Sequence, residues 1–232
     1  MAKMEWDLTG TREFQAGVSE VALFPMTNGT YGTGVPWSGV TAINENPSGA
    51  DITDLYADDI KYASLQSAEK FAFGIEAYDY PDEWSECDGS KEVAPGVYLG
   101  QQTRKAFGLV YKTKIGDDTH PGLDKGYMLH IIYNSTASPS SRGYATINEN
   151  PDAITMSWDA NSTPCKVTGH KACSTIVLDS TKCDATKLGA LEKKIYGDEN
   201  TDPTFQLPDD VIDALSSTNG NNNGEEGNTT NP

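Results

Sequence analysis

Apolar side chains recur at every second residue in several segments of this chain, from near its start to about residue 180. Phe71, Phe73 and Ile75 form the clearest example. The side chains of a β-strand point alternately to opposite faces, so this spacing predicts strands with one buried face. Further strands are predicted at 107–115, 127–133, 154–158 and 175–178, separated by turn-forming pairs such as Asn28-Gly29, Asp88-Gly89 and Pro121-Gly122. The sequence therefore predicts a mainly β fold.

One segment near the end of this β-rich region has a different period. Leu188, Leu191 and Ile195 lie three or four residues apart, which is the spacing of one helix face. Asp184 is a suitable N-terminal cap and Gly197 a suitable stop. We expect one amphipathic helix that packs on a sheet.

The chain after this helix is acidic. Residues 198–232 contain eight Asp or Glu and no Lys or Arg. The segment 208–215 is long enough for one or two helical turns, and 216–232 has no apolar residue and is predicted to be disordered. The expected organisation is a β domain over 1–197, an acidic extension over 198–215 and an Asn/Gly-rich tail over 216–232.

Two short segments share five residues. The letters Ile-Asn-Glu-Asn-Pro occur at 43–47 and again at 147–151. In both, an extended Ile precedes an Asn that the following Pro forces toward an extended conformation, so a strand leads into a turn. An internal duplication and two similar turns explain the match equally well.

The net charge excludes several classes of function. The formal charge of the whole chain is −17, and a surface this acidic repels the phosphates that nucleic-acid-binding domains attract. The first ten residues lack the apolar run of a signal peptide, and no run of eighteen apolar residues occurs. The expected protein is made in the cytosol and does not cross a membrane.

The cysteines raise the question of a metal site. Cys165, His170, Cys173 and Cys183 place four potential zinc ligands within nineteen residues. Their spacing matches no familiar zinc motif, and free thiols in a reducing compartment with a surface His are the simpler interpretation. Both interpretations remain open from sequence.

Motifs for catalysis are missing. No Gly-x-Ser-x-Gly nucleophile motif occurs, and Gly32-Thr-Gly34 lacks the helix that a phosphate-binding loop requires. The acidic stretch 51–59 lacks the Gly and terminal Glu of a calcium loop. We expect no enzymatic activity and no cofactor. An acidic hydrolase with a carboxylate pair is the remaining catalytic hypothesis, and no motif supports it.

Several segments resemble one known family. The chain is similar to the major tail tube proteins of siphophages that infect Gram-positive bacteria, over about residues 5–215. The matching segments are Val35 to Asp51, Leu55 to Tyr62, Ala72 to Gly89, Ala106 to Tyr111, Tyr144 to Trp158 and Leu188 to Gly197. The resemblance implies a β-sandwich or barrel with one flanking α-helix, in subunits that form hexameric rings with a continuous inner β-barrel.

The resemblance also implies a function and partners. Stacked rings form the hollow conduit of the virion tail, assembled in the bacterial cytoplasm, through which double-stranded DNA passes without specific binding. The implied partners are other copies of the chain, a tape measure protein in the lumen, and tail terminator and distal tail proteins at the ends. In the family a long loop reaches a neighbouring subunit, and the candidate here is the acidic loop from Asn44 to Asp59, with Asn44, Glu45, Asp51, Asp54, Asp58 and Asp59.

An alternative function rests on aromatic residues. Four Trp and eleven Tyr would suit a tail-associated carbohydrate-binding or receptor-binding β-sandwich module. Trp158 fits this less well, because its place on an alternating segment predicts core packing.

Overall fold

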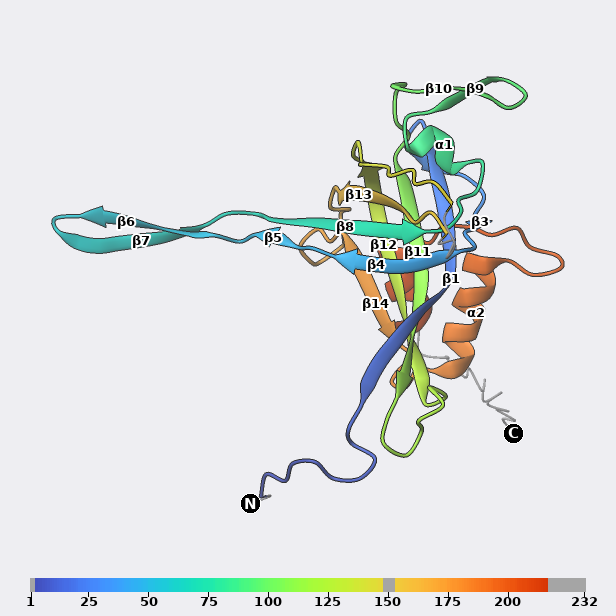
Figure 1. The fold of residues 1–232 in the computed structure, drawn as a ribbon. Coiled ribbons are helices and arrows are strands. Elements are labelled where there is room, and N and C mark those ends of the chain that lie inside the picture. Colours follow the sequence, from blue (N-terminus) through green and yellow to red (C-terminus); the bar gives the residue numbers. More distant parts are fainter. Residues whose placement is uncertain (1–2, 148–152, 217–232) are drawn as a thin grey trace, which may run out of the picture.

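The computed structural model describes residues 3–147 and 153–216 of the chain. Its main element is a ten-stranded antiparallel sheet, in which the path of neighbouring strands runs β2-β1-β11-β12-β13-β8-β4 (Figure 1). The predicted mainly β class is confirmed. The strands of this sheet are β1 (Phe14–Thr27), β2 (Thr30–Tyr31), β3 (Val35–Pro36), β4 (Val40–Glu45), β5 (Ser48–Gly49), β8 (Glu69–Ala77), β11 (Phe107–Gly116), β12 (Gly126–Ala137), β13 (Met156–Ser162) and β14 (Thr175–Asp179).

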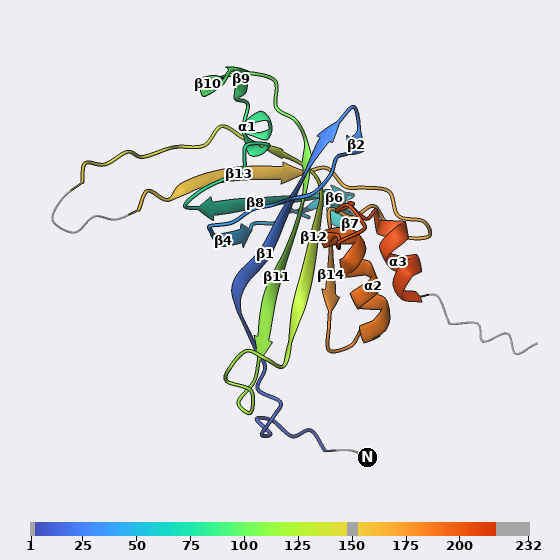
Figure 2. The same ribbon diagram turned by 90° about the vertical axis from the view of Figure 1, so that its right-hand side faces the viewer.

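The sheet has two parts that cross each other. Strands β1, β11, β12 and β14 lie along roughly one axis, in antiparallel order, and β4, β8 and β13 lie across that axis (Figures 1 and 2). The long strand β12 belongs to both parts, because Met128–Ile132 pair with β14 and Ser135–Ala137 pair with β13. The first core lies between the two parts and includes Leu23, Phe73, Leu109, Ile132 and Trp158.

A second core lies on the opposite face of β1, β11 and β12. The helix α2 (Ala185–Tyr196) covers this face with buried Leu188, Leu191 and Ile195. The Asp184 side chain accepts a hydrogen bond from the Lys187 backbone N–H at 3.0 Å, and Gly197 ends the helix with φ 77°. The predicted helix, its cap and its stop are therefore confirmed.

Residues that follow α2 complete the second core. The Phe205 ring contacts the rings of Phe24, Tyr31 and Tyr133, and Val211 of α3 (Pro208–Ser216) is buried. The segment after residue 197 thus packs on the β domain, where the sequence predicted an acidic extension. Its apolar residues at 205, 211, 214 and 215 supply this contact.

Phe205 requires a glycine on the adjacent strand. A Cβ added at Gly108 of β11 would lie 2.5 Å from the Phe205 ring and 3.0 Å from the Tyr31 ring. We expect Gly108→Ala to lower the free energy of unfolding by about 1–3 kcal/mol, because overpacking displaces a ring that three other rings hold. Urea unfolding measures the change. Gly100→Ala is the control, since a Cβ there meets no atom within 4 Å; an equal loss in both variants would contradict the packing argument.

Two sequence predictions need correction, and two further segments fall outside the described residues. Strand β13 begins at Met156, and Ile154 is 45% exposed, so the predicted strand at 154–158 starts too early. Residues 107–111 of β11 are buried on both faces because each face meets a different core, where the pattern predicted one buried face. The second copy of the shared sequence, 147–151, lies almost entirely outside the described residues, as does the tail 217–232.

The remaining elements are outside the main sheet. They are the short helix α1 (Trp84–Cys87) and two hairpins, β6 (Ile52–Ala57) with β7 (Ile60–Gln66) and β9 (Lys91–Ala94) with β10 (Val97–Leu99). Among residues 3–147 and 153–216, no helix is both long and apolar enough to cross a bilayer.

Candidate functional site

The most prominent surface feature is a hairpin that projects from the body, which we call the arm (residues 50–67). It consists of β6, the turn Asp58-Asp59 and β7, and it extends far beyond the main sheet (Figure 1). Both turn residues have positive φ, 52° and 61°, as a two-residue turn between twisted strands requires. The predicted acidic loop from Asn44 to Asp59 is therefore wrong as a description of conformation, because most of this segment is strand.

The arm continues two strands of the main sheet. Its base is closed by hydrogen bonds from the Ser67 N–H to the Asp51 carbonyl and from the Asp51 N–H to Ser67 Oγ, both 2.9 Å. Just inside this point, β5 pairs with Glu69 and Lys70 at the start of β8. The arm is thus fixed to the sheet through β5 and β8.

The arm has one face without charge. The register pairs Leu55 with Ala63, Thr53 with Leu65 and Ala57 with Ile60, and paired residues of antiparallel strands share a face. Leu55, Ile60 and Leu65 are 41%, 65% and 57% exposed. A group of large apolar side chains that their own chain leaves exposed is typical of an interaction surface. We call Thr53, Leu55, Ala57, Ile60, Ala63 and Leu65 the apolar arm face.

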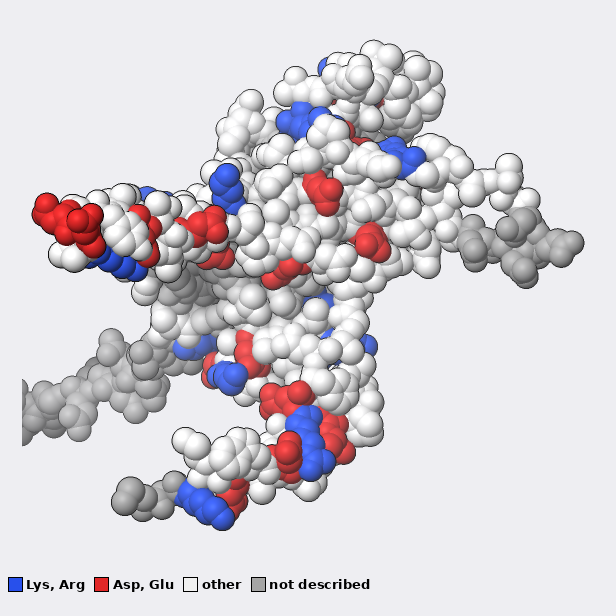
Figure 3. Space-filling model, turned by 60° about the vertical axis from the view of Figure 1, so that its left-hand side comes forward, with Lys and Arg blue, Asp and Glu red and all other residues white. Residues whose placement is uncertain are grey.

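The other arm face mixes charged and polar side chains with exposed Ile52 and Tyr56, and the tip is acidic. Asp54 accepts hydrogen bonds from Lys61 Nζ and Ser64 Oγ, both 2.7 Å away, and these bonds, that of Lys61 first, lower the pKa of Asp54. Asp58 and Asp59 lie at the tip, where Figure 3 shows carboxylates gathered at the end of the arm. The arm therefore combines an uncharged face with an acidic end.

The six residues predicted for this segment do not form one site. Asp51, Asp54, Asp58 and Asp59 belong to the arm, from its base to its tip. Asn44 and Glu45 lie in β4, inside the main sheet, and the Asn44 amide donates to the Glu76 carboxylate at 3.3 Å. Whether any of the six contacts another subunit stays a prediction.

Glu45 has a structural role within its own chain. The Tyr111 hydroxyl donates to its carboxylate at 2.6 Å, and the Tyr111 ring stacks on His130 with a centroid distance of 4.5 Å. Burial, with this hydrogen bond, raises the pKa of Tyr111, and burial lowers the pKa of His130. Glu45 thus ties β4 to β11 near the start of the arm.

The N-terminal segment presents a second group of apolar side chains. Met4, Trp6 and Leu8 are exposed and alternate with the acidic Glu5 and Asp7. This alternation is typical of a strand with one buried face, yet the segment is in no strand of its own chain. Its following residues are anchored, with the Gly10 N–H bonded to Asp118 at 2.8 Å and Glu13 to Lys125 at 2.7 Å.

Asp117 organises the loop that holds this segment. Its side chain is 2% exposed and accepts hydrogen bonds from the Thr119 and His120 backbone N–H groups at 2.8 and 2.7 Å and from Lys125 Nζ at 2.8 Å. The Lys125 bond, followed by that of the Thr119 hydroxyl, holds the pKa of Asp117 far below its usual value. The ionised form is therefore part of the native loop.

We expect Asp117→Asn to reduce the loss of stability in acid. A carboxyl with a lowered native pKa stabilises the protein above its unfolded-state pKa of about 3.9, and this contribution is lost as the pH falls below that value. Urea midpoints at a series of pH values measure it. Asp124→Asn removes the same charge from an exposed position of the same loop. Identical acid dependence in the two variants would contradict the role of Asp117.

The four potential zinc ligands do not form a cluster in the structure. All four cysteines have free thiols, and no cluster of three or more His, Cys, Asp or Glu suitable for a metal occurs in the described part of the chain. Cys165 and Cys173 are neighbours on paired backbone segments, whereas Cys183 precedes α2. The zinc hypothesis for Cys165, His170, Cys173 and Cys183 has no support in this geometry.

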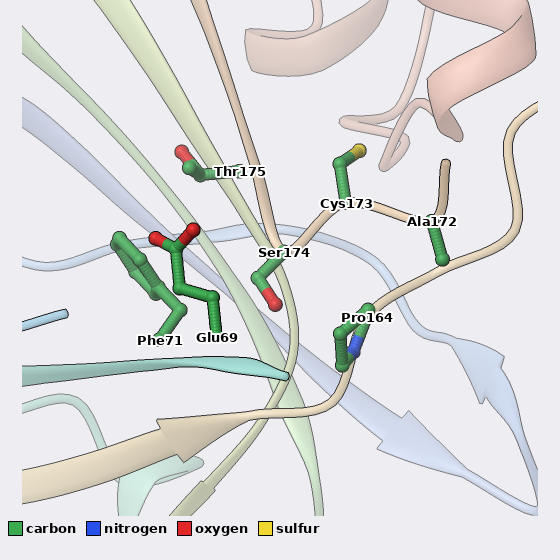
Figure 4. Close-up of a pocket in the computed structure, with 7 residues that line it drawn as sticks. All are labelled: Glu69, Phe71, Pro164, Ala172, Cys173, Ser174 and Thr175. Atoms are coloured by element: carbon green, nitrogen blue, oxygen red, sulfur yellow. The ribbon is translucent and has the colours of Figure 1, made fainter. Parts of the chain in front are cut away.

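One cavity of about 240 Å³ lies between the start of β8 and the start of β14. Glu69 and Phe71 line one side and Cys173, Ser174 and Thr175 line the other (Figure 4). Glu69 is the only carboxylate that lines it, so it offers no carboxylate pair for glycoside hydrolysis.

Three of the four tryptophans are in the core. Trp37, Trp84 and Trp158 are buried and contact one another, which confirms the core position predicted for Trp158. Trp6, at 75% exposure, is the one that a ligand can reach. A sugar platform built from several tryptophans is therefore absent from the described surface.

The two exposed apolar segments have a signal in the sequence that the expectation of an acidic loop does not use. Alternation at Leu55 with Ala57 and at Met4, Trp6 and Leu8 is the signal that indicates the apolar arm face and the N-terminal segment. The carboxylates in and near the arm instead favour an acidic loop.

Comparison with protein-family models and with curated proteins found no match to this chain.

Proposed function

We propose that this chain is a structural subunit that assembles with copies of itself, the major tail tube protein of a siphophage, forming stacked hexameric rings that conduct double-stranded DNA. The arm is the observation that carries the proposal. It projects from the body (Figure 1), and Leu55, Ile60 and Leu65 of the apolar arm face are exposed. The family resemblance of the sequence supplies the identity of the assembly.

The physics of a two-stranded hairpin supports a partner for the arm. Such a hairpin is at best marginally stable alone in water, and it gains stability when another element packs on its apolar face. Burying a side chain such as Leu55, Ile60 or Leu65 contributes about 1.5–3 kcal/mol. A neighbouring copy is the natural source of this element in an assembly of identical subunits.

The N-terminal segment supports self-association independently of the arm. The N-terminus lies at the bottom of Figure 1, apart from the arm, which projects to the left, and Met4, Trp6 and Leu8 near it are exposed. Contacts made by different surfaces of one subunit generate rings or filaments rather than closed pairs. Two separate apolar segments are therefore consistent with a ring that also stacks.

A polar sheet face is the candidate wall of the conduit. The outward face of β4, β8 and β13 carries Asn44, Glu76, Ser157, Asp159 and Asn161, and the register places small residues, Ala42, Ala72 and Gly74, among them. Lys70 of β8, two residues before Ala72, lies on the same face, next to the base of the arm. A wall in which carboxylates outnumber basic side chains makes few counterion-releasing contacts with phosphates, so DNA slides past it.

A charge reversal tests this assignment. We expect assembled Glu76→Lys/Asp159→Lys particles to bind double-stranded DNA at least tenfold more tightly than wild type at low salt, with affinity that falls as salt rises. Gel-shift titration measures this. Glu199→Lys/Asp202→Lys makes the same charge change at exposed positions elsewhere. Equal binding by both variants would contradict the assignment of this face.

Assembly itself is tested with the purified full-length chain. Negative-stain microscopy with light scattering across a concentration series is expected to show rings or uniform hollow tubes. A chain that stays monomeric at high concentration contradicts the proposal. Glycan-array binding by such monomers would favour the receptor-binding alternative, for which Trp6 is the one exposed tryptophan.

A further inference from the structure

Cys165 and Cys173 are directly opposed on two antiparallel backbone segments. The Cys165 N–H donates to the Cys173 carbonyl at 2.7 Å, and the Cys173 N–H donates to the Cys165 carbonyl at 3.0 Å. Residues that exchange both hydrogen bonds in this way have Cα atoms about 5.5 Å apart and side chains on the same face. This separation is near the most common value for disulfide-bonded cysteines. The Cα spacing of this pair is therefore in the range of disulfides, which also require the two Cβ atoms to approach to about 3.5–4.5 Å.

The surrounding structure holds this spacing. The seven-residue loop between the two cysteines is tied to α3, because the Thr168 N–H and hydroxyl donate to the Asp209 carboxylate at 2.9 and 2.7 Å. Val167 of the same loop is buried. Figure 4 shows Cys173 on the segment that leads into Thr175 of β14. A bond between the cysteines would join segments that are already fixed at both ends.

The two thiols are also accessible and close enough to influence each other. Both residues are partly exposed, whereas Cys87 is fully buried. Burial raises the pKa of the Cys165 thiol, and the neighbouring Cys173 thiol raises it further. Cys183 lies before α2 and has no cysteine opposite it in a backbone pair.

We propose that Cys165 and Cys173 are an oxidation site that forms an intramolecular disulfide with a small disulfide oxidant such as glutathione disulfide. One thiol loses its proton and attacks the oxidant, which gives a mixed disulfide and one glutathione thiolate. The second thiol then loses its proton and attacks the protein sulfur of that mixed disulfide, which releases the second glutathione thiolate. The two cysteines lose two electrons in total, and one glutathione disulfide becomes two glutathione thiols.

The Cys165–Cys173 disulfide would crosslink the segment that connects β13 to β14. It closes a loop that carries the Thr168 contact to α3, so it opposes separation of α3 from the second core. The chemistry does not depend on the proposed tail function. If that function is correct, the bond would form when particles leave the reducing cytosol, where thiols persist, for an oxidising medium.

Oxidation of the native full-length protein tests the proposal. Incubation with glutathione disulfide at mildly alkaline pH, where thiolates are more abundant, is expected to lower the intact mass by about 2 Da. Peptide mapping after alkylation should identify the 165–173 linkage, and Tm should rise by about 5 °C or more. The variants Cys165→Ser and Cys173→Ser should each abolish the mass loss, whereas Cys183→Ser should retain it. The corresponding Ala variants repeat the test with a different side chain.

Four outcomes would overturn the inference. These are thiols that stay free in the native state, a glutathione adduct that persists without resolving, a linkage that includes Cys183, and a disulfide between two chains. A disulfide that forms only in urea would also overturn the inference, because it would show that the native spacing does not permit the bond. None of these outcomes bears on whether the chain forms tubes, so the two proposals fail separately.

Discussion

Replacing Leu65 with Glu is expected to leave the protein folded but unable to assemble. Leu65 lies on the apolar arm face at 57% exposure, so its own chain loses little from the change. In an assembly the variant would bury a charge at a position where the Leu65 side chain would contribute about 1.5–3 kcal/mol through apolar burial. Because each 1.4 kcal/mol is a tenfold change in affinity, the concentration needed for assembly should rise at least tenfold, and a hundredfold is reasonable.

The adjacent residue provides the matched control. Gln66 lies on the opposite arm face, paired with Ile52, so Gln66→Glu introduces the same side chain one position away. Light scattering and negative-stain microscopy should show assembly by Gln66→Glu and monomers for Leu65→Glu, with equal Tm for the monomers. Leu55→Glu should behave like Leu65→Glu. If Leu65→Glu assembles as well as Gln66→Glu, the apolar arm face is not an interface.

The regular strands and the helix α2 could be predicted because hydrophobic spacing and local capping residues determine them. In β8, Phe71, Phe73 and Ile75 all face the first core, so hydrophobic spacing gives the strand directly. In α2, the capping bond of Asp184 and the positive φ of Gly197 are local effects of single residues. Such features depend on neighbours in sequence, and sequence patterns record them.

Strand β1 shows why the central part of the sheet could not be predicted. It is a 14-residue strand, yet its register shifts twice, and Gly17 and Glu20 have φ of 75° and 51°. Each shift moves the following side chains to the other face, which destroys the period of two. Residues 21–24 are buried on both faces because two cores meet there. A continuous apolar run of this kind does not distinguish a strand from a buried helix.

The candidate site was predicted in position but not in form. The segment from Asn44 to Asp59 was singled out for its carboxylates, and four of these lie in the arm. The position of Glu45 depends on Tyr111, 66 residues away in sequence, so no local pattern could assign it to the sheet. The hairpin conformation depends on pairing with β7, whose residues the acidic segment does not include.

Trp158→Ala is expected to have the largest effect on stability of any single change in the sheet. Trp158 is fully buried, and its ring lies 5.5, 5.6 and 5.7 Å from those of Trp84, Tyr80 and Trp37. Truncating a buried Trp costs about 3–5 kcal/mol, because the cavity cannot collapse where the two parts of the sheet cross. This is a large share of the roughly 5–15 kcal/mol that stabilises a typical domain, and it should lower Tm by about 10 °C.

Circular dichroism during urea unfolding measures this loss without relying on the removed fluorophore. Trp6→Ala is the matched control, because Trp6 is 75% exposed and its loss should change the free energy of unfolding by less than about 0.5 kcal/mol. Trp158→Phe should lie between the two, since it keeps one ring in contact with Trp84. A cost below about 1 kcal/mol for Trp158→Ala would mean that the two parts of the sheet do not share this core.

The comparison with Leu65→Glu separates two causes of failed assembly. The core variant Trp158→Ala should lose assembly together with stability, whereas the arm variant Leu65→Glu should lose assembly alone.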